Sequence, residues 1–75
     1  MALFQDSQQT IQRRNEEATK IFKMLLMDWE NVMLKASKRD GEFLASLHTI
    51  FNYKRSLTVS VEELFRLRDL VEKYL

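Results

Sequence analysis

The chain has no cysteine and no proline, and it has a single glycine, Gly41. The lack of cysteine excludes disulfides and thiolate metal sites, and it removes the residue that would indicate a redox compartment. The lack of proline and the near-absence of glycine remove the residues that most often interrupt helices. Because 45% of the residues are hydrophobic, we predict an all-α protein with long helices.

The sequence also lacks a strong charge of one sign and a long apolar run. Its 12 basic and 11 acidic residues give a formal net charge of +1, so no overall field attracts nucleic acid or an anionic membrane. The densest apolar segment, residues 21–36, contains Lys23, Asp28 and Glu30 and falls short of the roughly 20 apolar residues of a membrane span. The N-terminal residues have neither the basic region nor the cleavage site of a signal peptide. We therefore expect a cytoplasmic protein with no membrane partner.

Residues 21–36 predict the centre of a long helix that runs from about residue 6, with Asp6 as its N-cap, to about residue 38. Their apolar side chains recur with the 3.6-residue period of a buried helix face. The residues of this face are Ile21, Phe22, Leu25, Leu26, Trp29, Val32, Met33 and Ala36. Met24, Met27 and Leu34 project from the other side, so one neighbouring element cannot cover both sides.

The first part of this helix is polar and carries only a thin apolar stripe. Ile11, Asn15, Ala18 and Phe22 follow one another at intervals of four, three and four residues, as in a heptad seam. This spacing favours a coiled-coil partner for residues 1–20, which we expect to form a projecting helical arm. Two interpretations of Asn15 stay open, because a polar residue at such a position either fixes register and oligomeric state or is simply solvated.

Two shorter helices are predicted to follow, at about residues 42–54 and 61–75. Gly41 and the basic residues before it favour a helix end, and Asp40 is the expected N-cap of the next helix. Its apolar face is predicted to consist of Phe43, Leu44, Leu47, Ile50, Phe51 and Tyr53. Ser60 and Glu63 have the spacing of a capping box, and Val59 and Leu64 that of a hydrophobic staple. The last helix is expected to bury Val61, Leu64, Leu67, Val71 and Tyr74, flanked by Phe65, Leu70 and Leu75.

These lengths predict a single domain, residues 1–75, with a three-helix, bundle-like arrangement. At 1.5 Å per residue the first helix is about 50 Å long and the other two are about 20 Å each. The two short helices are therefore expected to form a hairpin that covers only residues 21–36 of the long helix. The surface that they leave open leads us to expect a dimer.

Catalysis has little support in this sequence. His48 is the only histidine, and its nearest acidic neighbour in the sequence, Glu42, lies on a different face of the predicted helix. The residue one turn after His48 is Asn52, so the helix lacks a pair of metal ligands. No glycine-rich loop is present to bring backbone amides to a substrate. We predict no catalytic residue, no metal site and no cofactor.

Nucleic-acid binding is the alternative function. Basic residues near the end of the first helix and around the second helix are the candidates for one patch: Lys35, Lys38, Arg39, Lys54 and Arg55. A helix, connector and helix follow one another in this region, as in a helix-turn-helix. However, Glu62 and Glu63 occupy the start of the last helix, where a recognition helix reads bases, and they repel phosphate.

The function that the sequence favours is a small protein–protein interaction module. It would act as a homodimer, an adaptor or a chaperone-like binding protein that covers an apolar helix of its partner. Methionine suits such a surface because its flexible thioether adapts to different neighbours. The predicted interface residues are Ile11, Asn15, Ala18, Met24, Met27 and Leu34.

Overall fold

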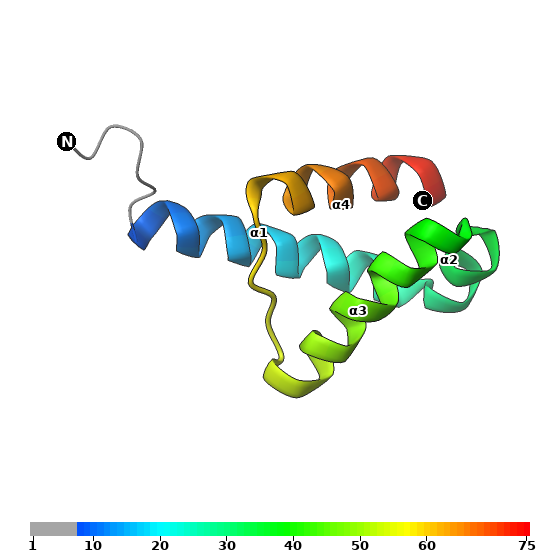
Figure 1. Ribbon diagram of the computed structural model, residues 1–75, viewed down its shortest axis with the longest axis horizontal. Coiled ribbons are helices and arrows are strands. Elements are labelled where there is room, and N and C mark those ends of the chain that lie inside the picture. The colour runs from blue at the N-terminus through cyan, green and yellow to red at the C-terminus, as the bar shows by residue number, and fades with distance from the viewer. Residues whose placement is uncertain (1–7) are drawn as a thin grey trace.

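The computed structural model describes residues 8–75, in which the chain forms four helices and no strand. They are α1 (Gln8–Met27), α2 (Trp29–Lys35), α3 (Lys38–Lys54) and α4 (Val61–Tyr74) (Figure 1). The all-α prediction is confirmed for this part of the chain. The number of helices differs from the prediction because the expected first helix is interrupted.

The break in the long helix lies at Asp28, so the predicted continuous helix over residues 6–38 is wrong. Asp28 has φ −128° and ψ 37°, and its backbone N–H donates to the Leu25 carbonyl over 3.2 Å. Its carboxylate accepts a hydrogen bond of 2.8 Å from the Asn31 side chain. Aspartate favours such breaks because its short side chain competes for local hydrogen bonds. The predicted start at Asp6 lies outside the described residues.

The next boundary lies at Ser37 rather than at Gly41. Ala36 and Ser37 are extended, and the Ser37 hydroxyl caps α3 by accepting from the Asp40 backbone N–H over 3.2 Å. The predicted N-cap, Asp40, is therefore wrong, because Asp40 already lies in the first turn of α3. Gly41 lies inside the helix.

The start of α4 agrees with the sequence. The Ser60 hydroxyl accepts from the Glu63 backbone N–H over 3.1 Å, and the Glu63 carboxylate accepts from the Ser60 backbone N–H over 2.8 Å. This is the predicted capping box. Val59 and Leu64 are both buried, as expected for the residues of a hydrophobic staple.

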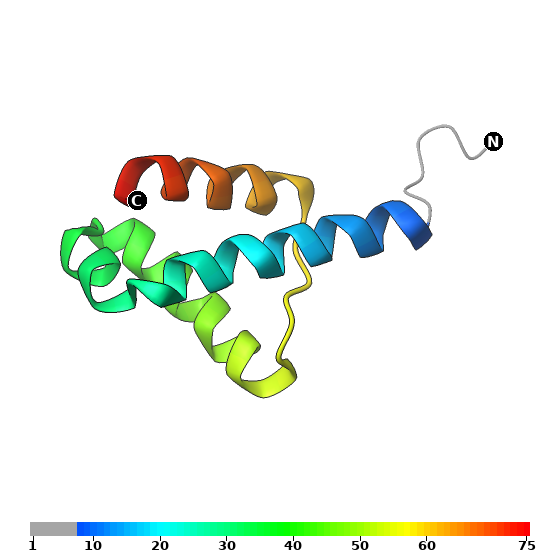
Figure 2. The same cartoon turned by 180° about the vertical axis from the view of Figure 1, so that it is seen from behind.

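Helix α4 lies alongside α1 and runs in the same direction, while α3 crosses on the other side of α1 (Figures 1 and 2). The start of α3 and the end of α4 approach each other, and the two helices diverge toward the connector, residues 55–60 (Figure 1). The expected α3–α4 hairpin is therefore wrong, because the main helical neighbour of α4 is α1. The physical reason is the connector, which runs extended past α1 and places α4 beside it.

One hydrophobic core joins α1, α2, α3, the connector and α4. The buried core residues are Ala18, Phe22, Leu25, Val32, Leu44, Leu47, Phe51, Leu57, Val59, Leu64, Leu67, Leu70 and Tyr74. The other residues of the predicted face at 21–36 pack against this core, so that prediction is confirmed. Two other faces need correction. Leu70 is buried on α4. Val61 is exposed at the start of α4, and Ile50 and Tyr53 are exposed near the end of α3, where the two helices diverge (Figure 1).

Candidate functional site

The three residues predicted for the second side of the first helix are exposed, but they do not form one patch. The exposed fractions are 48% for Met24, 88% for Met27 and 82% for Leu34. Met24 lines a groove beside α4, Met27 ends α1, and Leu34 lies on α2 beside Trp29. The break at Asp28 separates Leu34 from the two methionines along the chain.

The predicted seam on α1 faces the chain's own connector. Ala18 is fully buried, and the Asn15 amide oxygen accepts from the Val59 backbone N–H over 3.0 Å. The Thr19 hydroxyl accepts from the Leu57 backbone N–H over 3.0 Å, and Arg14 Nε donates to the Val59 carbonyl over 2.9 Å. We call Arg14, Asn15 and Thr19 the connector clamp. Both interpretations of Asn15 are therefore replaced by a third, in which Asn15 satisfies backbone of its own chain.

This clamp changes the predicted interface. Residues 14–19 pack within the chain, so they do not form a free arm. Ala18 and Asn15 are engaged inside the molecule, and Ile11 is half-buried in a cleft between α1 and the connector. Of the predicted interface residues, Met24, Met27 and Leu34 present the most apolar surface to solvent.

The basic residues of the alternative function are divided between the two ends of α3. Lys35, Lys38 and Arg39 surround the α2–α3 turn, whereas Lys54 and Arg55 lie at the end of α3. At 1.5 Å per residue, these groups are about 25 Å apart along the helix. The structure therefore does not join them into one patch.

A largely apolar hollow, with a volume of about 580 Å³, lies between α1 and α4. Ile21 and Met24 line it from α1, and Phe65 and Val71 line it from α4. The α4 residues of its charged rim are Arg68, Asp69 and Glu72. Phe65 is 54% exposed, although the sequence placed it at the flank of a buried face. We call this hollow the α1–α4 groove.

Arg68 fixes one wall of the α1–α4 groove. Its Nε and Nη2 both donate to a single carboxylate oxygen of Glu17 on α1. Its guanidinium also lies 5.4 Å from the centre of the Phe65 ring, within the range of a cation–π contact. Arg68 therefore links α1 to α4 and orients Phe65 at the same time.

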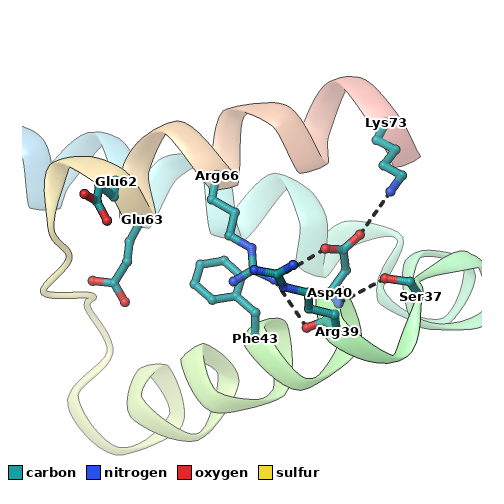
Figure 3. A pocket seen from close by; sticks show the side chains of 8 residues that line it. All are labelled: Ser37, Arg39, Asp40, Phe43, Glu62, Glu63, Arg66 and Lys73. Carbon is teal, nitrogen blue, oxygen red and sulfur yellow. Dashed lines mark hydrogen bonds and ion pairs between the residues drawn. The ribbon is translucent and has the colours of Figure 1, made fainter.

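A second hollow, which is polar, lies between the start of α3 and α4 (Figure 3). Asp40 is its centre, because the carboxylate accepts from the Tyr74 hydroxyl over 2.7 Å and from Lys73 Nζ over 3.2 Å, and pairs with Arg66 at 3.5 Å. We call Asp40, Arg66, Lys73 and Tyr74 the Asp40 cluster. It ties the start of α3 to the end of α4.

The hydrogen bonds of this cluster change the ionisation of Asp40. The bond from the Tyr74 hydroxyl, aided by Lys73 and Arg66, outweighs partial burial and lowers the pKa of Asp40 from 3.8 to about 2. The same carboxylate raises the pKa of Lys73. The Arg66 guanidinium also lies 4.1 Å from the centre of the Phe43 ring. Asp40 thus neutralises the charges of Arg66 and Lys73 within this hollow.

Tyr74 completes the cap of α3 in an unusual way. In a capping box the third residue of the helix accepts from the N-cap backbone, but here the Ser37 N–H donates to the Tyr74 hydroxyl, which in turn donates to Asp40. The sequence signal for this site was Ser37 three residues before Asp40. This spacing indicates that Ser37 caps α3, but it does not indicate that Tyr74 of α4 takes part in the cap.

His48 lies in an aromatic cluster instead of a polar site. Its ring centre is 4.7 Å from that of Trp29 and 6.3 Å from that of Phe22. Among residues 8–75, no group of histidine and acidic side chains is arranged to hold a metal ion. In the same part of the chain, no helix has both the length and the apolar character needed to cross a membrane.

Comparisons with protein-family models, with curated proteins and with solved structures find no match for this chain.

Proposed function

We propose that the protein is a non-enzymatic interaction module that binds an apolar helix in the α1–α4 groove. The observation that carries this proposal is that Met24 and Phe65 line one groove while each keeps about half of its surface exposed. Grooves between two helices are a common receptor for the apolar face of a third helix. Aromatic and methionine side chains are also enriched at protein interfaces.

Rigid walls support this proposal. Arg68 joins the walls through Glu17, the connector clamp fixes the start of α4, and the Asp40 cluster fixes its end. A preformed groove lowers the entropy lost on binding. Burying about 600 Å² of apolar surface would contribute on the order of 15 kcal/mol, from which an association cost of about 4–15 kcal/mol or more and the ordering of side chains are subtracted.

The bound helix belongs either to a second copy, which makes the protein a homodimer, or to another protein, which makes it an adaptor or a chaperone-like cover. The nucleic-acid alternative lacks comparable support because its basic residues lie at both ends of α3.

Site-specific photocrosslinking tests the proposal. The photoreactive amino acid p-benzoylphenylalanine, placed at Phe65, should crosslink to protein in cells that express the chain. The same amino acid at Tyr53, which is 90% exposed on α3 and does not line the α1–α4 groove, is the matched control. We expect adducts at position 65 and few at position 53. Equal yields at both positions, or none at position 65, would contradict the proposal.

A further inference from the structure

The outer surface of α4 carries a strip of residues with the spacing of a helix–helix seam. Val61, Phe65, Arg68, Glu72 and Leu75 follow one another at intervals of four and three residues. All of them are exposed, and Phe65, Arg68 and Glu72 also line the α1–α4 groove. Intervals of four and three place side chains on one line along a helix, which is the geometry of a coiled-coil contact. We call these residues the outer strip.

We propose that the partner in this groove is a second copy of the chain, docked so that the two α4 helices run antiparallel with Phe65 opposite Leu75 and Arg68 opposite Glu72. This inference rests on the proposed function and identifies its partner. The two-fold axis of such a dimer makes every contact occur twice. Residues 65–75 of the two helices then form two apolar pairs at the ends of this segment and two ion pairs in its centre, and Val61 lies outside the paired segment.

Charge complementarity selects this arrangement over a parallel dimer. In a parallel pair, equivalent positions meet, so Arg68 would face Arg68 and Glu72 would face Glu72 of the second copy. Like charges opposite each other in an interface are strongly unfavourable. A parallel dimer on this strip is therefore disfavoured.

The same reasoning selects the register. If the antiparallel helices shift by one heptad, Phe65 faces Arg68 and Val61 faces Glu72 of the second copy. Each apolar side chain then meets a charged one, and neither carboxylate meets a guanidinium. The register with Phe65 opposite Leu75 instead pairs apolar side chains with each other and each guanidinium with a carboxylate.

The charged groups are also free to make these pairs. Arg68 uses Nε and Nη2 for Glu17, which leaves the Nη1 side of its planar guanidinium for a second carboxylate. Glu72 makes no ion pair or hydrogen bond with any residue of the described chain, 8–75. A second copy therefore supplies Glu72 with a partner that the described chain does not provide, and it supplies Arg68 with a second carboxylate besides Glu17.

Met24 lies beside the outer strip and enlarges the contact. It is the exposed α1 residue that shares the α1–α4 groove with Phe65. A stable interface buries at least about 1,000 Å² in total, so additional area from α1 favours a stable dimer. The methionine side chain lets α1 of each copy contribute to this area because it adapts to irregular surfaces.

Single-cysteine crosslinking tests the register. The chain has no cysteine, so Phe65→Cys and Leu75→Cys each introduce one thiol. In the proposed dimer, these positions face each other only when the two variants are mixed, because identical positions are offset by about 15 Å along the helices. Disulfides form only when the Cα atoms lie within about 7 Å. Mild oxidation of an equal mixture should give roughly tenfold more disulfide-linked dimer than either variant alone.

Three results would overturn the proposal. Crosslinking of either variant with itself indicates a parallel dimer or another register. A monomeric mass of the unsubstituted chain, measured by light scattering up to about 1 mM, excludes the dimer. Photocrosslinking of position 65 to a different protein refutes the second copy as partner but leaves the proposed function standing.

A charge reversal provides a second measurement that keeps Phe65 and Leu75 in place. Glu72→Lys puts a lysine opposite Arg68 of the second copy and should raise the dimer Kd roughly tenfold or more at low salt. Glu62→Lys makes the same charge change on exposed α4 surface beyond the paired residues and is the matched control. High salt should reduce the difference in dimer Kd between the two variants because it screens charges. Equal Kd values for both variants would contradict the ion pairs.

Discussion

The two ends of α4 are fixed by polar contacts of different kinds. Before α4 begins, the connector clamp binds backbone groups of Leu57 and Val59. At the end of α4, the Asp40 cluster joins side chains that are charged or phenolic. Both sets of contacts hold α4 in place. The connector clamp satisfies buried backbone groups, whereas the Asp40 cluster neutralises charge near the surface.

This difference decides how much each device contributes to stability. Leu57 and Val59 are buried, so a backbone N–H that loses its acceptor there keeps its full desolvation penalty. The partners of Asp40 are partly hydrated, since the exposed side-chain fractions are 34% for Arg66 and 61% for Lys73. Solvent screens such pairs and lowers their contribution. The neutral hydrogen bonds of the connector clamp, from Asn15 and Thr19, should therefore contribute more per bond than those of the Asp40 cluster.

The largest effect is expected from breaking the connector clamp. Asn15→Ala removes the acceptor of the Val59 N–H and should lower the free energy of unfolding by about 1–3 kcal/mol. Gln12→Ala, one turn earlier on α1, removes only an exposed hydrogen bond to Glu16 and should lower it by less than about 0.5 kcal/mol. Urea unfolding followed by circular dichroism measures both. Similar losses for the two variants would show that the clamp does not stabilise the connector.

A smaller effect is expected from Asp40→Asn, which removes the charge from the Asp40 cluster. The pairs are partly exposed, so we expect a loss of about 1–2 kcal/mol at pH 7. The pKa of Asp40 is lowered to about 2, below its ordinary 3.8, so its contribution is present above about pH 5 and is lost as the pH falls toward 2. The difference between the original protein and Asp40→Asn should therefore shrink between pH 5 and pH 2 in urea unfolding.

The same pH series sharpens the comparison between the two devices. The Asn15 bond joins neutral groups, so the loss caused by Asn15→Ala should stay constant over this range and in 1 M NaCl. The loss caused by Asp40→Asn should decrease in both conditions. If the loss of stability caused by Asp40→Asn did not depend on pH, the Asp40 cluster would not act through its charge. If the loss caused by Asn15→Ala did depend on pH, the Asn15 bond would not act as a bond between neutral groups.

The sequence predicted the features that depend on nearby residues. The apolar period of residues 21–36 identified the core face of α1 and α2, and the spacing of Ser60 and Glu63 identified the start of α4. These signals are local because helix periodicity and capping involve residues that are at most a few turns apart. They were sufficient for the fold class.

The features that the sequence missed depend on contacts between distant segments. Asn15 and Val59 are hydrogen-bonded although 44 residues separate them, and Asp40 and Tyr74 are separated by 34 residues. No periodic pattern on α1 distinguishes an asparagine that accepts from a connector from one that sets a coiled-coil register. The interface prediction at Asn15 and Ala18 therefore followed the correct stripe but assigned it to the wrong neighbour.

Gly41 gives the smallest expected effect and tests the boundary beside the Asp40 cluster. The sequence favoured a helix end at this residue, whereas α3 continues through it with a negative φ. A Cβ added at Gly41 meets only the end of Met33, at an ordinary 3.8 Å. Gly41→Ala should therefore raise the free energy of unfolding by about 0.5–1 kcal/mol, because alanine favours helix interiors.

Ala45→Gly, one turn later on the exposed side of α3, is the reverse control and should lower the free energy of unfolding by a similar amount. If a helix ended at Gly41, Gly41→Ala would instead lower the free energy of unfolding. The residue after a helix end commonly adopts positive φ, which alanine disfavours by about 1 kcal/mol. If both substitutions lower the free energy of unfolding in urea, a helix boundary lies at Gly41, as the sequence favoured. Asp40 would then lie outside α3, and Ser37 could not be the N-cap of α3.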